Sequence, residues 1–417
     1  MLSRIKQNKA ILSWSLYDFA NQPFTTIIIT FIYSAFFTKV IAVDEQSGVF
    51  LWANAVAIVA ISASFLSPLL GAIADNSGYR KYFFISSTWI CVLFTSLLFF
   101  PKEGDVYLAL FFFIIANIAF EVGTVFYNSY LLDLSDDKSV GKLSGFAWGL
   151  GFIGGVLALL ACFVFFDVNS SSSIRRINIL VALWLFVFSI PTFIFVSDRR
   201  RDKWSNTYIK NSFLSVGHTF RTIREYKSIF KFLIARLFYN DGLITIFALG
   251  GIYAVSSIGF NFEEVLLLAI VLNISAGIGS FLFGFLEYRI GVKMAINITL
   301  LTLIIATLIA FYAPETTIPK QLFWFSGILI GLMVGPNQSC SRSLMISLTP
   351  IGKKNEFFGF YALTGKATSF LGPFLYGFIA KLYNQQSALF VVIIFFVIGF
   401  ILFNKLQIPN EKNKEIM

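Results

Sequence analysis

Charged residues are scarce in this chain of 417 residues, because only 13% are Asp, Glu, Lys or Arg while 57% are hydrophobic. The mean hydropathy is +0.78. A protein that folds in water needs a far more polar surface than this composition can supply. The chain is therefore no soluble globular enzyme, and we expect an all-α membrane protein with little room for a separate soluble domain.

Cysteine and histidine are also rare, which argues against a metal centre and a disulfide framework. The three cysteines, Cys91, Cys162 and Cys340, stand apart in apolar runs and form no CxxC pattern. The single histidine, His218, falls in a polar stretch. The sequence has no GxSxG, HExxH or GxxxxGK[ST] motif. We therefore expect no enzyme, no metal, no resident cofactor and no ATP-driven reaction, with a coupling proton or cation left open.

Long apolar runs predict twelve membrane-spanning helices in two groups of six. The basic N-terminal segment is followed by a run that is too long for a cleaved signal peptide, so we interpret it as part of a retained first span. The predicted spans are 11–38, 49–74, 82–100, 106–131, 143–166 and 176–197, then 229–257, 262–286, 293–312, 320–348, 356–381 and 387–406.

The distribution of basic residues predicts the orientation. Most of the 32 lysines and arginines fall in the loops on the side that also holds both chain ends, and such loops stay in the cytoplasm. The net charge of +10 then reflects topology and not binding to nucleic acid. Both termini are expected in the cytoplasm, and the short tails favour a bacterial inner membrane over a vacuole.

The loop between the two groups carries a periodic apolar pattern. The domains that we predict are 1–198, a cytoplasmic loop at 199–228 and 229–417. Within the loop, apolar residues recur at steps of three and four, which is typical of an amphipathic helix on an anionic membrane surface. The stripe consists of Ile209, Phe213, Val216, Phe220 and Ile223.

The two halves of the chain resemble each other. Ser129 aligns with Ser343, and Gly145 with Gly359, without a gap. These matches fall at equivalent helix junctions, which favours a duplicated six-helix unit and two pseudo-symmetric bundles. The glycines that are dense in the fifth and eleventh spans fit either close helix packing or a hinge, and both roles stay open.

Six ionisable residues fall inside predicted spans, where a charge is costly. Equal numbers of acids and bases suggest mutual neutralisation around one aqueous cavity, although structural pairing between helices would also explain them. The six are Asp18, Glu121, Arg236, Asp241, Arg342 and Lys366.

Polar residues accompany these charges at helical spacing. Such a stripe avoids lipid and faces partner helices or a water-filled path. We predict a central site for a zwitterion or small polar solute, with Asp18 and Glu121 as proton or cation sites and with Arg236 and Arg342 binding anionic groups. The other predicted members are Asn21, Asn128, Asn240, Asp241, Asn337, Gln338 and Lys366.

The segment GAIADNSGYRK at 71–81 resembles the loop motif of the major facilitator superfamily. In that superfamily the loop locks the cytoplasmic gate, so the resemblance implies a gate here. This sequence departs from the motif at Asn76 and Tyr79, which usually are basic. The second-half copy at 284–293 is degenerate because Tyr288 stands where an acid would be. The matching residues are Gly71, Asp75, Gly78, Arg80 and Lys81.

Longer strings resemble one subfamily, the vacuole-effluxer group that includes fungal vacuolar amino-acid exporters. They are SWSLYDFANQPFTT at 13–26, FYNSYLLDLS at 126–135, SGFAWGLGFIGG at 144–155, FLIARLFYNDGLITI at 232–246 and the segment 335–373. The resemblance implies the major facilitator fold and alternating access without ATP. It implies transport of an amino acid only if the fungal activity extends to this chain.

Three functions fit these observations. Secondary transport of a small polar or zwitterionic solute, amino-acid export included, is our main expectation, with proton coupling or uniport both open. A lipid or lysolipid flippase would need a lateral apolar opening, and a receptor of the same fold would bind without moving the solute. We expect a small-molecule substrate and the lipid bilayer as partners, no nucleic acid, and function as a monomer.

Overall fold

The structure is a computed structural model, and every secondary-structure element among its described residues is helical. The described residues are 2–136, 139–167, 170–198, 205, 207–350, 352–366 and 368–407.

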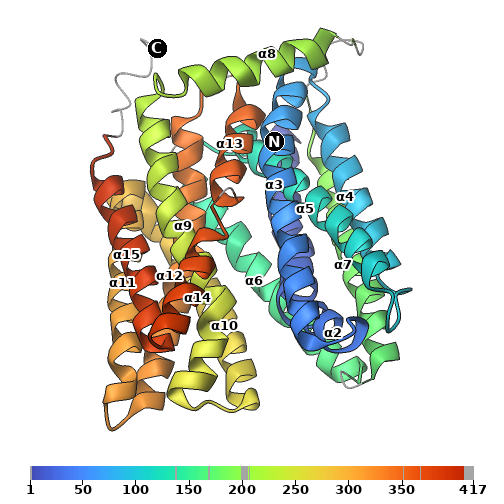
Figure 1. Ribbon diagram of the computed structural model, residues 1–417. Helices are drawn as coiled ribbons and strands as arrows, with labels where there is room; N and C mark the ends of the chain where they lie inside the picture. The colour runs from blue at the N-terminus through green and yellow to red at the C-terminus, as the bar shows by residue number, and fades with distance from the viewer. Residues whose placement is uncertain are drawn as a thin grey trace. The chain divides into compact units, whose positions relative to one another are not determined.

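The first half holds α1 (Leu2–Pro23), η1 (Phe24–Phe31), α2 (Tyr33–Phe36), η2 (Phe37–Ile41), α3 (Glu45–Ser77), α4 (Arg80–Leu97), α5 (Val106–Leu134), α6 (Val140–Phe165) and α7 (Ser171–Phe195). The second half holds α8 (Thr207–Thr222), α9 (Lys227–Tyr253), η3 (Ala254–Ile258), α10 (Phe262–Ile290), α11 (Val292–Tyr312), η4 (Ala313–Glu315), α12 (Pro319–Leu348), α13 (Lys354–Lys366), α14 (Leu371–Leu382) and α15 (Gln385–Asn404) (Figure 1).

Each predicted span coincides with a helix or with a run of consecutive helices. Nine of these, within the described residues, are long and apolar enough to cross a membrane. The remaining spans correspond to the short α4, to the polar-rich α12 and to the two separate helices α13, which ends at Lys366, and α14, which begins at Leu371. The interruption was not predicted, because hydropathy alone reads 356–381 as one helix.

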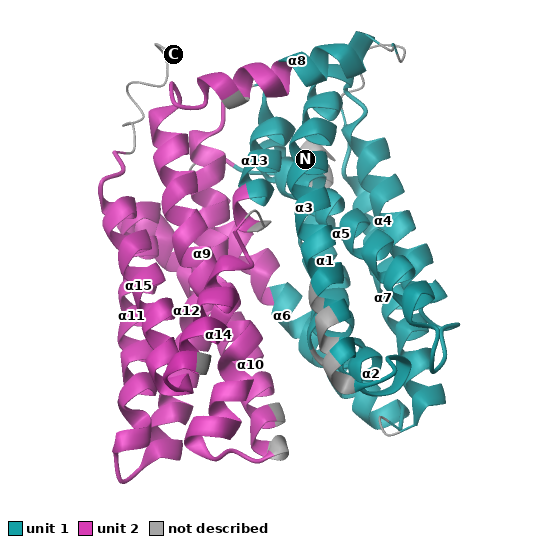
Figure 2. Ribbon diagram, in the orientation of Figure 1, with its two compact units in different colours: residues 1–135, 150–214, 352–363 teal, residues 136–149, 215–351, 364–417 magenta. Residues whose placement is uncertain are grey.

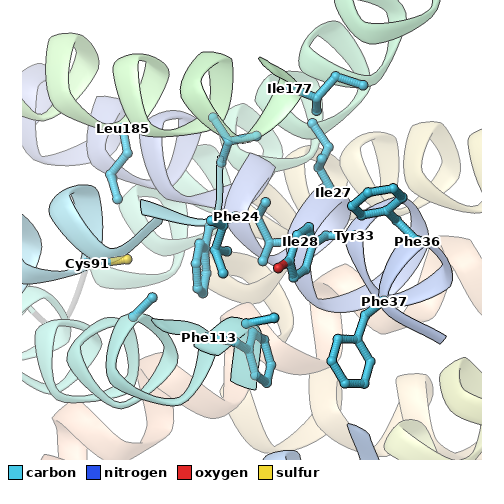
Figure 3. Close-up of a cluster of buried hydrophobic side chains, with 14 of the residues drawn as sticks. Phe24, Ile27, Ile28, Tyr33, Phe36, Phe37, Cys91, Phe113, Ile177 and Leu185 are labelled. Atoms are coloured by element: carbon cyan, nitrogen blue, oxygen red, sulfur yellow. The ribbon is translucent and has the colours of Figure 1, made fainter. Parts of the chain in front are cut away.

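The first span changes its winding after Pro23. Residues Phe24–Phe31 form a π-helix, and this segment contains six consecutive β-branched residues, which are poor α-helix formers. Phe24, Ile27 and Ile28 from this segment are fully buried in an apolar cluster with Phe113 of α5 (Figure 3). Burial of this face compensates the weaker backbone geometry.

The contacts divide the chain into two compact units (Figure 2). Unit 1 comprises residues 1–135, 150–214 and 352–363, and unit 2 comprises 136–149, 215–351 and 364–417. The predicted domains are continuous in the sequence. In the structure, by contrast, the first part of α6 belongs to unit 2 and most of α13 belongs to unit 1.

Glycine contacts explain why α6 is divided. A Cβ at Gly145 would lie 2.5 Å from the carbonyl oxygen of Ser280 in α10, within unit 2. A Cβ at Gly154 would overlap the carbonyl oxygen of Phe19 in α1, within unit 1. Small residues allow such close backbone approach, so each part of α6 is bound to its own unit, and the packing role predicted for these glycines is observed.

A helix, α8, covers most of the predicted amphipathic stretch, while the basic run 199–204 lies outside the described residues. Its first half belongs to unit 1 and lies crosswise to α3 (Figure 1). Ser212 is buried and accepts a hydrogen bond of 2.8 Å from Asn76, whereas Phe213 is 59% exposed. The exposed Phe213 and Ile209 suit the predicted contact with a membrane surface, which stays a prediction.

Candidate functional site

The predicted gate residue Asp75 binds the start of α13 within unit 1. Its Oδ2 accepts a hydrogen bond of 2.9 Å from the backbone N–H of Glu356, and its Oδ1 accepts one of 2.5 Å from Asn355 Nδ2. At Gly71, one turn earlier, a Cβ would overlap the carbonyl oxygen of Asn355. A carboxylate at a helix N-terminus satisfies an otherwise unpaired donor and complements the helix dipole. Asp75 therefore caps α13 from a neighbouring helix.

Arg80 joins three helices of unit 1. Gly78 ends α3 with a positive φ of 71°, which a glycine adopts without strain, and the chain then turns into α4. The Arg80 guanidinium contacts Asp133 of α5 at 2.6 Å and Asp198, just after α7, at 3.2 Å. Its Cζ lies 3.7 Å from the centre of the Tyr130 ring. The side chain of Arg80 is only 9% exposed, so this ion pair is largely shielded from water.

Lysines extend the same network. Lys81 Nζ donates a hydrogen bond of 2.8 Å to the carbonyl oxygen of Val196, and Lys354 Nζ contacts Asp133 at 2.6 Å. The five predicted gate residues thus lie in one connected region of unit 1. Sequence reasoning missed Asp133 and Asp198, although acids at helix ends beside basic loops were a usable signal.

We expect Asp75→Ala to lower the free energy of unfolding by about 1–2 kcal/mol, because the first turn of α13 loses its cap. Denaturation of the purified protein would measure this change, and hydrogen exchange of residues 354–363 would locate it. The exposed Glu103→Ala serves as the control and should change stability by only a few tenths of a kcal/mol. Equal exchange rates in the two variants would contradict the capping role.

The predicted polar stripes of unit 1 lie on α1 and α5. Asp18 is 9% exposed, Asn21 6% and Glu121 8%, and Asn128 is half-buried. Ionisable and amide groups that are buried at membrane depth need polar surroundings. These four residues are therefore directed into the protein, as the sequence predicts.

Aromatic contacts fix the relation of α1 to α5. Trp14 donates a hydrogen bond of 2.9 Å to the carbonyl oxygen of Tyr127, and the two rings stack at 4.6 Å. One turn further along α1, a Cβ at Gly151 of α6 would lie 3.4 Å from the Cβ of Asp18. Asp18 is thus held next to the second part of α6.

In unit 2, predicted site residues gather where α9 and α12 meet the end of α13. Arg236 donates a hydrogen bond of 3.3 Å to Thr364 Oγ1, and Asn240 donates one of 3.2 Å to the carbonyl oxygen of Gly365. Gln338 donates one of 3.1 Å to Asn240 Oδ1. A side chain at Gly365 would lie 3.1 Å from the Arg236 guanidinium, so the glycine makes room for the cation.

Asp241 lies on the other side of the interruption between α13 and α14. Its Oδ2 accepts a hydrogen bond of 3.2 Å from the backbone N–H of Gly372, and Asp241 is only 1% exposed. Lys366 is the last residue of α13, and its side chain lies outside the described part of the structure.

Two further predicted residues of α12 contact other helices. Asn337 donates a hydrogen bond of 2.9 Å to Thr299 of α11. Arg342 donates two hydrogen bonds of 2.9 Å to Ser144 of α6, one to the hydroxyl and one to the carbonyl oxygen, and its Cζ lies 5.7 Å from the ring of Trp148. These contacts attach α12 to α11 and to the first part of α6, so they stabilise the packing of unit 2.

Sequence reasoning also missed Glu287, a buried acid of α10. A Cβ at Gly141 of α6 would lie 2.5 Å from its Cδ, and its carboxyl group lies beside the side chains of Cys340 and Ser343. The second-half loop motif has Tyr288 at the acidic position, yet the adjacent Glu287 meets the start of α6. An acid near a shifted motif position was the available signal.

The predicted residues are thus distributed between the units. Arg236, Asn240, Asp241 and Gln338 come together around the interrupted helix in unit 2, while Asp18 and Glu121 belong to unit 1. The single aqueous cavity shared by all six charges stays a prediction. Across the described part of the chain, we find no group of three or more His, Cys, Asp or Glu residues that could hold a metal ion.

Comparison with known proteins gives two kinds of relatives. The family described as vacuole effluxer Atg22 like matches residues 41–415. An uncharacterized MFS-type transporter, YxiO, of Bacillus subtilis (strain 168) is 31% identical over 417 residues, which cover 97% of this chain and 96% of that protein. Autophagy-related protein 22 of Coccidioides immitis (strain RS) is 24% identical, over 76% of this chain and 65% of that protein.

Solved structures share the fold. The proton:xylose symporter XylE of the major facilitator superfamily superposes with a TM-score of 0.75 at 14% identity, over 97% of this chain and 96% of that one. The human organic anion transporter MFSD10 gives a TM-score of 0.75 at 13% identity, over 95% and 99%. These likenesses confirm the predicted twelve-helix major facilitator fold. The chain belongs to the vacuole effluxer Atg22-like family and is a multi-pass transporter of the major facilitator superfamily.

Proposed function

We propose that the protein carries a small polar or zwitterionic solute, an amino acid in our first choice, across the membrane by alternating access. The observation that supports this most directly is the polar cluster of unit 2, in which Arg236, Asn240 and Gln338 meet the end of α13. A guanidinium in such a setting suits a carboxylate, which it can bind through two parallel hydrogen bonds. Relatives described as vacuole effluxers favour export.

The solute site that we propose consists of the polar residues that the sequence places inside the spans. Asp18 and Glu121 would serve as proton or cation sites, and Arg236 and Arg342 would bind anionic groups such as the carboxylate of the solute. The remaining proposed members supply hydrogen bonds or charge. They are Asn21, Asn128, Asn240, Asp241, Asn337, Gln338 and Lys366.

The proposal includes energy coupling, location and gating. A related fold belongs to a transporter titled a proton:xylose symporter, which makes a proton the first coupling ion to test. The basic loops favour an inner-membrane location with both termini in the cytoplasm. The Asp75 network would then act as the cytoplasmic gate, because it binds the start of α13 to α3.

The experiment begins with an unbiased comparison of metabolites between cells with and without the protein. Counterflow of the best candidate is then measured in proteoliposomes. Arg236→Ala should lower the initial rate about 10–100-fold, the effect of losing a charge-assisted hydrogen-bond donor. The exposed Arg176→Ala is the matched control and should transport at the wild-type rate. If both variants retain full activity, the proposed site is wrong.

A further inference from the structure

The eleventh span is interrupted between α13 and α14. α13 ends at Lys366, and α14 begins at Leu371. An interruption exposes the last carbonyl groups of one helix and the first N–H groups of the next. In a membrane these groups find no water, so other parts of the protein must bind them. Interrupted helices of this kind line ion and substrate sites in transporters.

Two adjacent residues of α9 satisfy both sides of the interruption. Asn240 donates its amide hydrogen to the carbonyl oxygen of Gly365, near the end of α13. Asp241 accepts the backbone N–H of Gly372, in the first turn of α14. A donor thus meets the carbonyl end and a carboxylate meets the N–H end, which is the arrangement that both helix dipoles favour.

The approach of α14 to α9 is very close. A Cβ at Gly372 would overlap Thr245 Oγ1, and it would lie 3.1 Å from the carbonyl oxygen of Asp241. Thr245 in turn donates a hydrogen bond of 2.7 Å to that carbonyl oxygen. Because no side chain fits at Gly372, the backbone N–H of α14 reaches the carboxylate directly.

One oxygen of this carboxylate has no hydrogen-bond partner. Asp241 Oδ1 is fully enclosed and unsatisfied in the described structure, while Oδ2 binds Gly372. A buried charged oxygen without a partner is costly. A proton bound at Oδ1 would remove the charge and needs no further ligand, whereas a sodium ion needs several oxygen ligands.

Charged groups on the helices at the interruption bear on whether Asp241 is protonated. Arg236 lies on α9 itself and donates to Thr364 near the end of α13, whereas Arg342 of α12 donates to Ser144 of α6. α15 carries no acid or base, and the first turns of α14 carry none except the phenol of Tyr376. Apart from Asp241, Glu356 at the start of α13 is the only Asp or Glu on the described parts of α9, α12, α13, α14 and α15.

We propose that Asp241 is a proton-binding site of this transporter and that protonation at Oδ1 weakens its hold on the first turn of α14. The proton comes from water and leaves a neutral carboxyl group, which accepts a weaker hydrogen bond than a carboxylate. The first turn of α14 then opens more easily. This inference rests on the proposed transport function for its purpose, but its test needs no transported solute.

Infrared difference spectroscopy tests the site directly. The full-length protein in lipid vesicles is titrated from alkaline to acidic pH, and the band of the protonated carboxyl group is recorded. Asp241→Asn should lose one such band, and Asn240→Ala, which keeps the carboxyl group beside the same helix end, should retain it. If the wild-type and Asp241→Asn difference spectra are identical, the proton site is wrong.

Hydrogen exchange tests the consequence for α14. Acidification should speed the exchange of the Gly372 amide about fivefold in the wild type, after correction for intrinsic rates, which corresponds to replacing a charge-assisted hydrogen bond by an ordinary one. Asp241→Asn should exchange fast at every pH. Asn240→Ala should keep the pH-dependent step, which a purely structural role of Asp241 would not produce. An unchanged rate across the titration would overturn the inference.

A comparison with and without sodium distinguishes a proton from a metal cation at this site. The same titration is repeated with sodium chloride and with choline chloride, and the band of Asp241 should be the same in both. Suppression of the band by sodium alone would assign the site to a metal cation and overturn the proton proposal. A protein that binds this proton but fails every counterflow assay would contradict the proposed function only, so the two failures are distinguishable.

Discussion

Arg80→Ala is expected to lower the free energy of unfolding by about 2–3 kcal/mol, because two carboxylates lose the cation that they share. Removing one partner of a buried ion pair leaves an uncompensated charge. Asp198 is only 15% exposed and loses most, while Asp133 is 40% exposed and keeps Lys354 as a second partner. We therefore expect a smaller loss of unfolding free energy than for a fully buried ion pair.

Chemical denaturation in detergent would measure the effect of Arg80→Ala, and a second substitution would show its cause. In the double variant Arg80→Ala with Asp198→Asn, part of the lost stability should return, because the uncompensated carboxylate is gone. The exposed Arg176→Ala should stay within about 0.5 kcal/mol of the wild type. No recovery in the double variant would contradict an electrostatic origin.

Gly71→Leu should be more disruptive, with a loss of about 3 kcal/mol or more. A side chain at Gly71 meets the backbone of Asn355, whose carbonyl carbon would lie 2.7 Å from its Cβ. The opposite glycine, Gly359, is packed as closely against Pro68 of α3. Backbone atoms cannot yield as a flexible side chain does, so α13 must move away and Asp75 loses its contacts.

Exchange of residues 354–363 would report the release of α13, and we expect it to rise at least about tenfold in Gly71→Leu. Gly71→Ala should give an intermediate value. The control is Gly377→Leu in α14, where a Cβ meets no atom within 4 Å. If Gly377→Leu has the same effect as Gly71→Leu, the close contact between α3 and α13 is not the cause.

The helices could be predicted from the sequence because a membrane span requires a long apolar run, and that requirement is local. Every predicted span coincides with helix to within several residues. The exception is 356–381, where α13 and α14 are separate helices. Asn240 and Asp241, which bind the backbone on either side of the interruption, are more than a hundred residues away in the chain.

The gate residues likewise have contact partners that could not be predicted from the sequence. Gly71, Asp75 and Arg80 were predicted from resemblance to a known loop motif. Their partners were not, because Asp133 lies on α5 and Asp198 just after α7. Glu287 was missed for a related reason. The motif places an acid at the position of Tyr288, whereas the neighbouring Glu287 is the acid that is buried, between Gly141 of α6 and the side chains of α12.

The sequence by itself determined that the chain lies in a membrane, where its helices run, which buried charges need explanation and which family it resembles. The tertiary structure decided which polar groups meet, that the eleventh span is broken and that α6 and α13 each divide between the two units. Hydropathy is a property of neighbouring residues, whereas a hydrogen-bond partner depends on how each helix is rotated and how closely its glycines allow another backbone to approach.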